Sequence, residues 1–218
     1  MRTVLIQGAS TAAGWHDFER GGWVNRLSTD VLEFNAIHTT EAINFQNDAI
    51  PGNTILPILR DKARVDKFKR LGSVVTILSV GLNELKIMSG CNRPQVTPEK
   101  FSMALGEYSE YVGSREVTTI YVGVEKLTDE VIATENHNIF EKDLAEEYNS
   151  IIIDHAINTG MHYIDLHDIL DNSMVNPDGY HPNQYGHEAI AENIKGVLHS
   201  LGLYRVDVDI SGEAPHYA

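Results

Sequence analysis

Thr3-Val4-Leu5-Ile6-Gln7-Gly8-Ala9-Ser10-Thr11 is the stretch that decides the fold of this chain, a short and largely apolar run that ends in small residues. Such a run predicts a buried strand of a parallel sheet. Gly8 allows the backbone to turn sharply after the strand. Because α/β proteins bind ligands outside the carboxyl ends of their strands, we expect Ser10 at the ligand-binding edge. A small-residue turn after a first strand also begins nucleotide-binding loops, so this stretch alone leaves two kinds of site open.

The rest of the chain alternates between strand-like and helix-like segments. Strands are predicted at 3–7, within 33–45, and at 74–80, 117–122 and 162–166, and helices at about 23–31, 54–69, 98–112, 139–158 and 184–201. This alternation predicts a parallel sheet with helices on both faces. We therefore predict a single α/β domain over residues 1–218, a flavodoxin-like three-layer α/β/α sandwich with a five-stranded parallel sheet. Residues after about 204 have weak periodicity and are expected to form an extended tail.

A carboxylate and an imidazole lie close together in the run Asp178-Gly179-Tyr180-His181-Pro182. In a Ser-His-Asp system the histidine takes the serine proton, and the carboxylate fixes the tautomer of the histidine and stabilises the imidazolium. Gly179 tolerates left-handed backbone and the residue before Pro182 is pushed toward extended geometry, so one short loop can present both side chains. Asp-Gly and His-Pro pairs also form ordinary surface turns, and the pentapeptide by itself fits either interpretation.

Two further segments supply groups that suit an anion. The strand-like run 74–80 continues into Gly81-Leu82-Asn83-Glu84, which places the amide of Asn83 at the same edge of the sheet as the serine. The segment Ile50-Pro51-Gly52-Asn53-Thr54 precedes a helical pattern, and its exposed backbone N–H groups suit a negative charge. Taken alone, Asn83 also fits the pattern of an ordinary residue in a strand-to-loop turn.

These four places, in this order, resemble the SGNH (GDSL-type) hydrolase family, which is named for a serine, a glycine, an asparagine and a histidine. The matching positions are Ser10, Gly52, Asn83 and His181, with Asp178 as the third member of a triad. The resemblance implies a serine ester hydrolase that cleaves small-acyl esters or thioesters through an acyl-enzyme. It also implies an oxyanion hole made of the Ser10 and Gly52 amides and the Asn83 side chain.

The chain departs from the family pattern at two positions and agrees with it at a third. The usual first block is Gly-Asp-Ser, but Ala9 stands in the middle here, and we expect this to alter local hydrogen bonding more than proton transfer. The usual third block ends in Asp, whereas Glu84 is one methylene longer and is expected to change how the Asn83 loop is held. Gly21-Gly22-Trp23 resembles a Gly-Gly-Trp found in a subset of bacterial and isoamyl-acetate-type esterases.

Composition excludes several classes of protein. The 218 residues suffice for one domain with a substantial core, and the formal net charge of −14 disfavours a nucleic-acid partner. The basic residues between Arg60 and Arg70 alternate with apolar ones and indicate the solvated face of a helix. The single cysteine, Cys91, excludes an internal disulfide.

We see no run of eighteen apolar residues, no charged-then-apolar stretch of the kind that forms a leader and no lipidation motif in the sequence. We therefore expect a cytoplasmic protein with no membrane partner, whose partner is a small-molecule ester substrate. No cofactor is expected, and no histidine spacing on one helix suggests a metal site. The sequence specifies no oligomeric state.

Two other functions, a dehydrogenase and a binding protein, each have some support in the sequence. Residues 4–10 look like the start of a short-chain dehydrogenase, but Ala12 replaces the middle glycine and no Tyr is followed four residues later by Lys. A second alternative is a binding protein that keeps the fold and has weakened chemistry, as Ala9 hints. Substrate specificity is expected to reside in the loops at 86–96 and 126–138.

Overall fold

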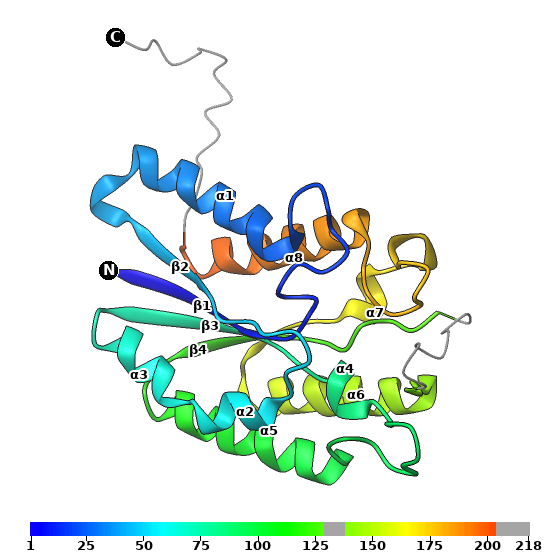
Figure 1. Ribbon diagram of the computed structural model, residues 1–218. Coiled ribbons are helices and arrows are strands. Elements are labelled where there is room, and N and C mark those ends of the chain that lie inside the picture. The colour runs from blue at the N-terminus through cyan, green and yellow to red at the C-terminus, as the bar shows by residue number, and fades with distance from the viewer. Residues whose placement is uncertain (129–137, 204–218) are drawn as a thin grey trace.

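The computed structural model describes residues 1–128 and 138–203, and Figure 1 shows the arrangement of the elements. Most of the 126–138 loop and the predicted tail therefore lie outside the described residues. The strands are β1 (Arg2–Gly8), β2 (Ile43–Asn47), β3 (Ser73–Ser79), β4 (Thr118–Val122) and β5 (His162–Ile164). They form one sheet in the order β2-β1-β3-β4-β5, and every pair is parallel. The predicted five-stranded parallel sheet is confirmed.

Helices cover both faces of the sheet (Figure 1). The main helices are α1 (Gly22–Ile37), α2 (Ile55–Arg60), α3 (Ala63–Lys69), α5 (Pro98–Gly113), α6 (Lys142–Thr159) and α8 (Gln184–Ser200). The short ones are α4 (Leu82–Leu85) and α7 (Leu166–Ile169), with 3-10 turns η1 (Thr39–Glu41) and η2 (Asn172–Met174). Helices α1 and α8 pack on one face, and α2, α3, α5 and α6 pack on the other. The three-layer sandwich is thus the observed fold.

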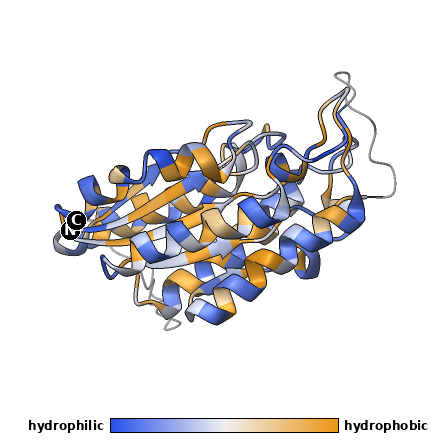
Figure 2. Cartoon of the chain, turned by 90° about the horizontal axis from the view of Figure 1, so that it is seen from below, coloured by the Kyte–Doolittle hydropathy of each residue, from blue (hydrophilic) through white to orange (hydrophobic). Residues whose placement is uncertain are grey.

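The strands are apolar on both faces because both faces are buried. In β1, Val4 and Ile6 belong to the core under α1 and α8, whereas Leu5 belongs to the core under the opposite helices. Figure 2 shows hydrophobic residues along the strands and a mixture of hydrophobic and hydrophilic residues on the outer helices. Trp23, at the start of α1, is fully buried in the first of these cores.

Two predicted boundaries are wrong. The predicted helix at 54–69 is two helices, because the amides of Lys62, Arg64 and Val65 bond to carbonyls three residues back, at 3.4, 2.9 and 3.0 Å, in place of a continuous α-helical ladder. The second strand begins only at Ile43, since α1 continues through Ile37. The side chain of Asn35 holds that start, pairing with both the amide and the carbonyl of Ile43 at 2.8 Å.

Gly8 shows why the first strand must end in a glycine. It pairs with Ser79 across the β1–β3 ladder, and a Cβ at this position would lie 2.7 Å from the Ser79 carbonyl oxygen. Such a separation is too short for a real side chain, so only glycine lets the two strand ends run this close together. The close approach brings the segments after β1 and β3 to one edge, where Ser10 and Asn83 follow.

Candidate active site

A cavity of about 270 Å³ opens at the carboxyl edge of the sheet. Its lining consists of Ser10, Trp15, Gly52, Leu82, Asn83, Lys86, Asn138, Phe140, Tyr180 and His181. The structure therefore brings together all four residues that the family resemblance singled out. Asp178, the predicted third member of the triad, lies behind His181 rather than in the lining.

Ser10, His181 and Asp178 form a continuous chain of hydrogen bonds. His181 Nε2 lies 2.8 Å from Ser10 Oγ, and His181 Nδ1 lies 2.7 Å from Asp178 Oδ2. Burial alone would raise the pKa of Asp178, but hydrogen bonds from the His181 ring and from the His181 and Tyr180 amides hold that pKa below its usual value. An ionised Asp178 accepts a proton-bearing Nδ1, which leaves Nε2 as the acceptor facing the serine hydroxyl.

The loop that carries Asp178 and His181, residues 175–183, is held mainly by its own sequence neighbours, and we call it the His loop. Oδ1 of Asp178 accepts hydrogen bonds from the amides of Tyr180 at 3.1 Å and His181 at 3.0 Å. The Asn176 amide donates to the His181 carbonyl at 2.8 Å, and Val175 forms an antiparallel bridge with Pro182. One carboxylate thus closes the turn with one oxygen and holds the imidazole with the other.

The loop between β1 and α1, residues 9–21, is held in a different way, and we call it the Ser loop. Asp17 is buried, and its carboxylate accepts hydrogen bonds from the amides of Arg20 and Gly22 and from the side chain of Arg26. Burial alone would raise the pKa of Asp17, but these amide and guanidinium donors keep it below its ordinary value. The carboxylate therefore joins the end of the loop to the first turns of α1.

His187 on α8 fastens the middle of the Ser loop from across the fold. Its Nδ1 accepts the amide of Trp23 at 3.2 Å, so Nε2 carries the proton and donates to the carbonyl of Trp15 at 2.8 Å. The ring is fully buried, and burial lowers the pKa of His187 to about 4. His187 is therefore a neutral structural residue near the site, and it fixes the backbone of an aromatic residue that lines the cavity.

The opposite side of the cavity presents candidate donors for an oxyanion. Within the described residues, the amides of Ser10 and Gly52 make no hydrogen bond to the protein. Gly52 has φ +82°, a left-handed conformation that favours glycine. Asn83 is buried at the cavity wall, and its Nδ2 donates to the Asn53 carbonyl at 3.1 Å, which joins the segment after β3 to the segment that carries Gly52.

Glu84 holds the same two segments together more firmly. Its carboxylate is fully buried and accepts the amide of Ile55 at 2.5 Å and the amide of Gly81 at 2.8 Å. Burial raises the pKa of Glu84 to about 7 despite these two amide donors. The carboxylate thus spans from the Gly81 turn to the start of α2. That this tie differs from the one made by a shorter Asp stays a prediction.

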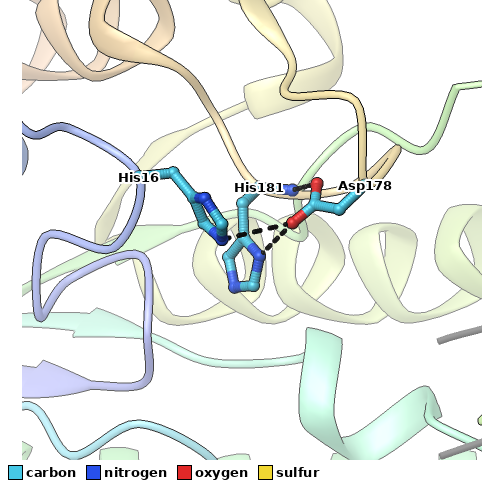
Figure 3. A group of neighbouring side chains, drawn as sticks. All are labelled: His16, Asp178 and His181. Atoms are coloured by element: carbon cyan, nitrogen blue, oxygen red, sulfur yellow. Dashed lines mark hydrogen bonds and ion pairs between the residues drawn. The ribbon is translucent and has the colours of Figure 1, made fainter. Parts of the chain in front are cut away.

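His16 is the residue of this region that the sequence analysis missed. Its Nε2 lies 3.4 Å from Asp178 Oδ2, the same oxygen that bonds His181, and the two imidazole rings are 4.9 Å apart (Figure 3). His16 has φ +66°, which is uncommon for a residue with a side chain. Burial and the neighbouring His181 lower the pKa of His16. No motif marks it, because its proximity arises from long-range packing.

A second missed acid, Glu125, is buried beyond the end of β4. Burial raises the pKa of its carboxyl group, and the electrostatic influence of His181 opposes that rise.

The comparisons with known proteins agree with this geometry. The model of the GDSL-like lipase/acylhydrolase family matches residues 7–189, so the chain belongs to that family. Similar solved structures are a lipase/acylhydrolase from Enterococcus faecalis (21% identity, TM-score 0.64, covering 90% of this chain and 97% of that chain) and a psychrotrophic esterase from Pseudoalteromonas sp. (18%, 0.61, 91% and 97%). An acetylxylan esterase from Geobacillus stearothermophilus is also similar (15%, 0.62, 93% and 94%). These likenesses support the fold.

No match to a curated protein sequence was found. Family membership favours a hydrolase over the dehydrogenase that residues 4–10 also suggested, and it supports action on esters. Among the helices of residues 1–128 and 138–203, none is both long and apolar enough to cross a membrane.

Proposed function

We propose that the protein is a serine hydrolase that cleaves small-acyl esters or thioesters through an acyl-enzyme. The observation that carries the proposal is the hydrogen-bonded chain from Ser10 through His181 to Asp178 at the wall of an open cavity. A serine hydroxyl is a weak nucleophile by itself, and it needs an adjacent base whose tautomer is fixed. The bonds at 2.8 and 2.7 Å supply that base and that fixation.

The mechanism follows from the direction of these bonds. Ser10 Oγ attacks the acyl carbon while His181 Nε2 takes the hydroxyl proton, and Asp178 stabilises the imidazolium that forms. The imidazolium then gives the proton to the leaving alkoxide or thiolate as the acyl-enzyme forms. Water attacks the acyl-enzyme by the same route, with His181 again as the base, and the acid product leaves.

The negative charge of the tetrahedral intermediate needs donors that are already oriented. The amides of Ser10 and Gly52 and the side chain of Asn83 are the groups we assign to this role, since all three residues border the cavity. Glu84 acts as a positioning residue because it ties together the segments that carry Gly52 and Asn83. Loss of one such donor commonly costs on the order of a hundredfold in turnover, so Asn83→Ala is expected to retain weak activity.

The size and character of the cavity favour a short acyl group. Its volume of about 270 Å³ lies near the lower end of the range for ligand pockets, roughly 300–1,000 Å³. Trp15, Phe140 and Tyr180 give it an aromatic wall, and the rings of Phe140 and Tyr180 stack with centroids 4.6 Å apart. Lys86 and Asn138 give it a polar side, which suits a substrate that has both apolar and polar parts.

A panel of nitrophenyl esters tests the proposal. The expected result is turnover of esters of about two and four carbons and a lower kcat/KM for eight carbons, because the cavity limits the acyl chain. Ser10→Ala is the matched control, since it removes one oxygen and is expected to lose roughly a thousandfold or more of the activity. If no chain length is hydrolysed, or if Ser10→Ala is as active as the wild type, the proposal is wrong. A structure of the Pseudoalteromonas esterase is described as inhibited by monoethylphosphonate, so phosphonates are suitable reagents for this chain too.

A further inference from the structure

Within residues 1–128 and 138–203, the His16 ring makes no polar contact of ordinary hydrogen-bond length. Within the described residues, its only polar approach is the one from Nε2 to Asp178 Oδ2 at 3.4 Å, which is longer than an ordinary N–H···O hydrogen bond. The ring forms T-shaped pairs with Phe18 and Trp15, which offer it no charge partner. A merely positioning histidine would be expected to donate a well-formed hydrogen bond to the carboxylate, so this geometry points to another use of the nitrogen.

The spacing around this nitrogen matches the coordination shell of a transition metal. In a tetrahedral zinc site with metal–ligand bonds of about 2.0–2.2 Å, neighbouring ligand atoms lie roughly 3.3–3.6 Å apart. The separation between His16 Nε2 and Asp178 Oδ2 already has this value. One ligand atom from each of His16, Asp178 and His181 lies within 4.8 Å of the others (Figure 3). The set of two imidazoles and one carboxylate is one that zinc commonly takes.

The approach to these atoms is open. About a third of the His16 side chain and a quarter of the Asp178 side chain are exposed, whereas His181 is nearly buried between the cavity and the other two. A metal ion can therefore reach the His16 and Asp178 atoms from solvent before it touches His181. The move that His181 must make is small, because its Nδ1 needs to open from 2.7 Å to the ligand spacing given above while it keeps Asp178 as a neighbour.

We propose that His16, Asp178 and His181 form an inhibitory binding site for a divalent transition-metal ion of the zinc type, which switches the hydrolase off by changing the tautomer of His181. The metal takes the lone pair of Nδ1, and the proton displaced from Nδ1 goes through solvent to Nε2. The imidazole stays neutral, so protons balance. Nε2 then donates to Ser10 Oγ instead of accepting from it, and the serine loses its base.

Only the inhibitory consequence rests on the proposed function, and metal binding itself is measurable without it. Calorimetric titration of the chelator-treated protein with Zn²⁺ is expected to show one site per chain, and Mg²⁺ is expected to show none because it prefers oxygen ligands. His16→Asn is the informative variant, since asparagine tolerates the left-handed backbone found at this position. It is expected to weaken Zn²⁺ binding by roughly tenfold or more, because one of three protein ligands is lost.

His38→Asn is the matched control. It removes an exposed histidine at the end of α1 that is remote from the cavity, and it is expected to leave Zn²⁺ binding unchanged. Ester hydrolysis gives the second readout as the half-inhibitory Zn²⁺ concentration, taken relative to the uninhibited rate of each variant. This concentration is expected to rise in His16→Asn by the same factor as the dissociation constant.

Three outcomes would overturn the proposal. They are the absence of Zn²⁺ binding to the wild type, equal binding by the wild type and His16→Asn, and binding that leaves hydrolysis unaffected. If the wild type hydrolyses no ester at all, the proposed function fails, and the calorimetric comparison still decides whether the metal site exists.

Discussion

The Ser loop and the His loop meet at the same cavity, but only the Ser loop depends on a bond from a distant helix. The His loop closes on itself through hydrogen bonds between residues that are two to six positions apart, such as the Asp178 bonds to the amides of Tyr180 and His181. The Ser loop depends on His187, which is 172 positions away from its partner Trp15 in the sequence. The His loop is held mainly by local bonds, whereas the Ser loop combines local bonds to Asp17 with bonds from a distant helix.

This difference explains which parts of the site a sequence can disclose. Local turns leave a signature of glycine, proline and aspartate, and the pentapeptide 178–182 shows it plainly. A loop held from a distant helix has no such signature. The sequence therefore did not predict that His16 of the Ser loop lies beside Asp178. The difference also predicts that substitutions in the His loop affect mainly chemistry, whereas those in the Ser loop, apart from Ser10 itself, affect mainly stability and substrate fit.

Asp178→Asn is expected to have the largest effect. The amide can keep its oxygen on the backbone of the turn, but its NH₂ group then faces His181 Nδ1 and favours the wrong tautomer, so kcat is expected to fall by about 10³–10⁴-fold. The melting temperature should change little, and steady-state kinetics beside thermal unfolding checks both. A large loss of stability with a small loss of kcat would show that the His loop is not self-supporting.

The titration of His187 is expected to have the next largest effect. The pKa of its ring is about 4 in the folded protein against an ordinary 6.5, so the unfolded chain takes up a proton first as the pH falls below 6.5. The contribution to the free energy of unfolding is full above that pH and is lost as the pH falls to about 4, a change of about 3 kcal/mol.

Denaturant unfolding at several pH values measures this effect. His187→Gln, which keeps a donor and an acceptor, is the matched control because it does not titrate. The wild type should lose more stability than this variant between pH 6.5 and 4. Parallel curves for the two proteins would mean that His187 does not hold the Ser loop as a neutral ring.

Asp17→Asn is expected to have a moderate effect on stability. The carboxylate accepts two amides and the Arg26 side chain, and a neutral amide loses the charge-assisted part of these bonds. The expected loss is about 1–2 kcal/mol in the free energy of unfolding, with kcat for a two-carbon ester within a few-fold of the wild type. Asp30→Asn, a partly exposed acid on α1 paired with Lys195, is the control and is expected to cost less. Equal losses in the free energy of unfolding for the two variants would show that the buried Asp17 carboxylate stabilises the fold no more than Asp30 does.

Trp15→Leu is expected to have the smallest effect and to act on substrate fit. Trp15 lines the cavity and is about half exposed, and its ring lies 5.7 Å from the ring of His181. Loss of part of the aromatic wall is expected to raise KM for a four-carbon ester about fivefold, which corresponds to about 1 kcal/mol, with little change in kcat. A fall in kcat without a change in KM would place Trp15 in the chemistry rather than in substrate fit.

The sequence disclosed the fold because apolar periodicity and chain order carry it. Residues 3–7 and 74–80 are apolar on both faces, and this alone predicts strands buried on both sides. Local deviations were missed where a side chain overrides the pattern, as Asn35 does when it fixes the start of β2 at Ile43. The split of the predicted helix was also missed, and there the backbone bonds of residues 62–65 change to partners three residues back.

At the site, the residues that follow strands could be predicted, but the ties between them could not. Ser10 and Asn83 follow the adjacent strands β1 and β3, so their meeting is a consequence of topology. The tie that Glu84 makes between Gly81 and Ile55 could not be predicted from the sequence, because Ile55 is 29 positions away from Glu84.

The most direct test of the central claim is mass-spectrometric mapping of the residue that an activated phosphonate modifies. The account predicts one adduct per chain, located on Ser10, with loss of ester hydrolysis in proportion to labelling and much slower labelling of Asp178→Asn. An adduct on another residue, or an unlabelled protein that still hydrolyses esters, would contradict the claim that Ser10 is the nucleophile.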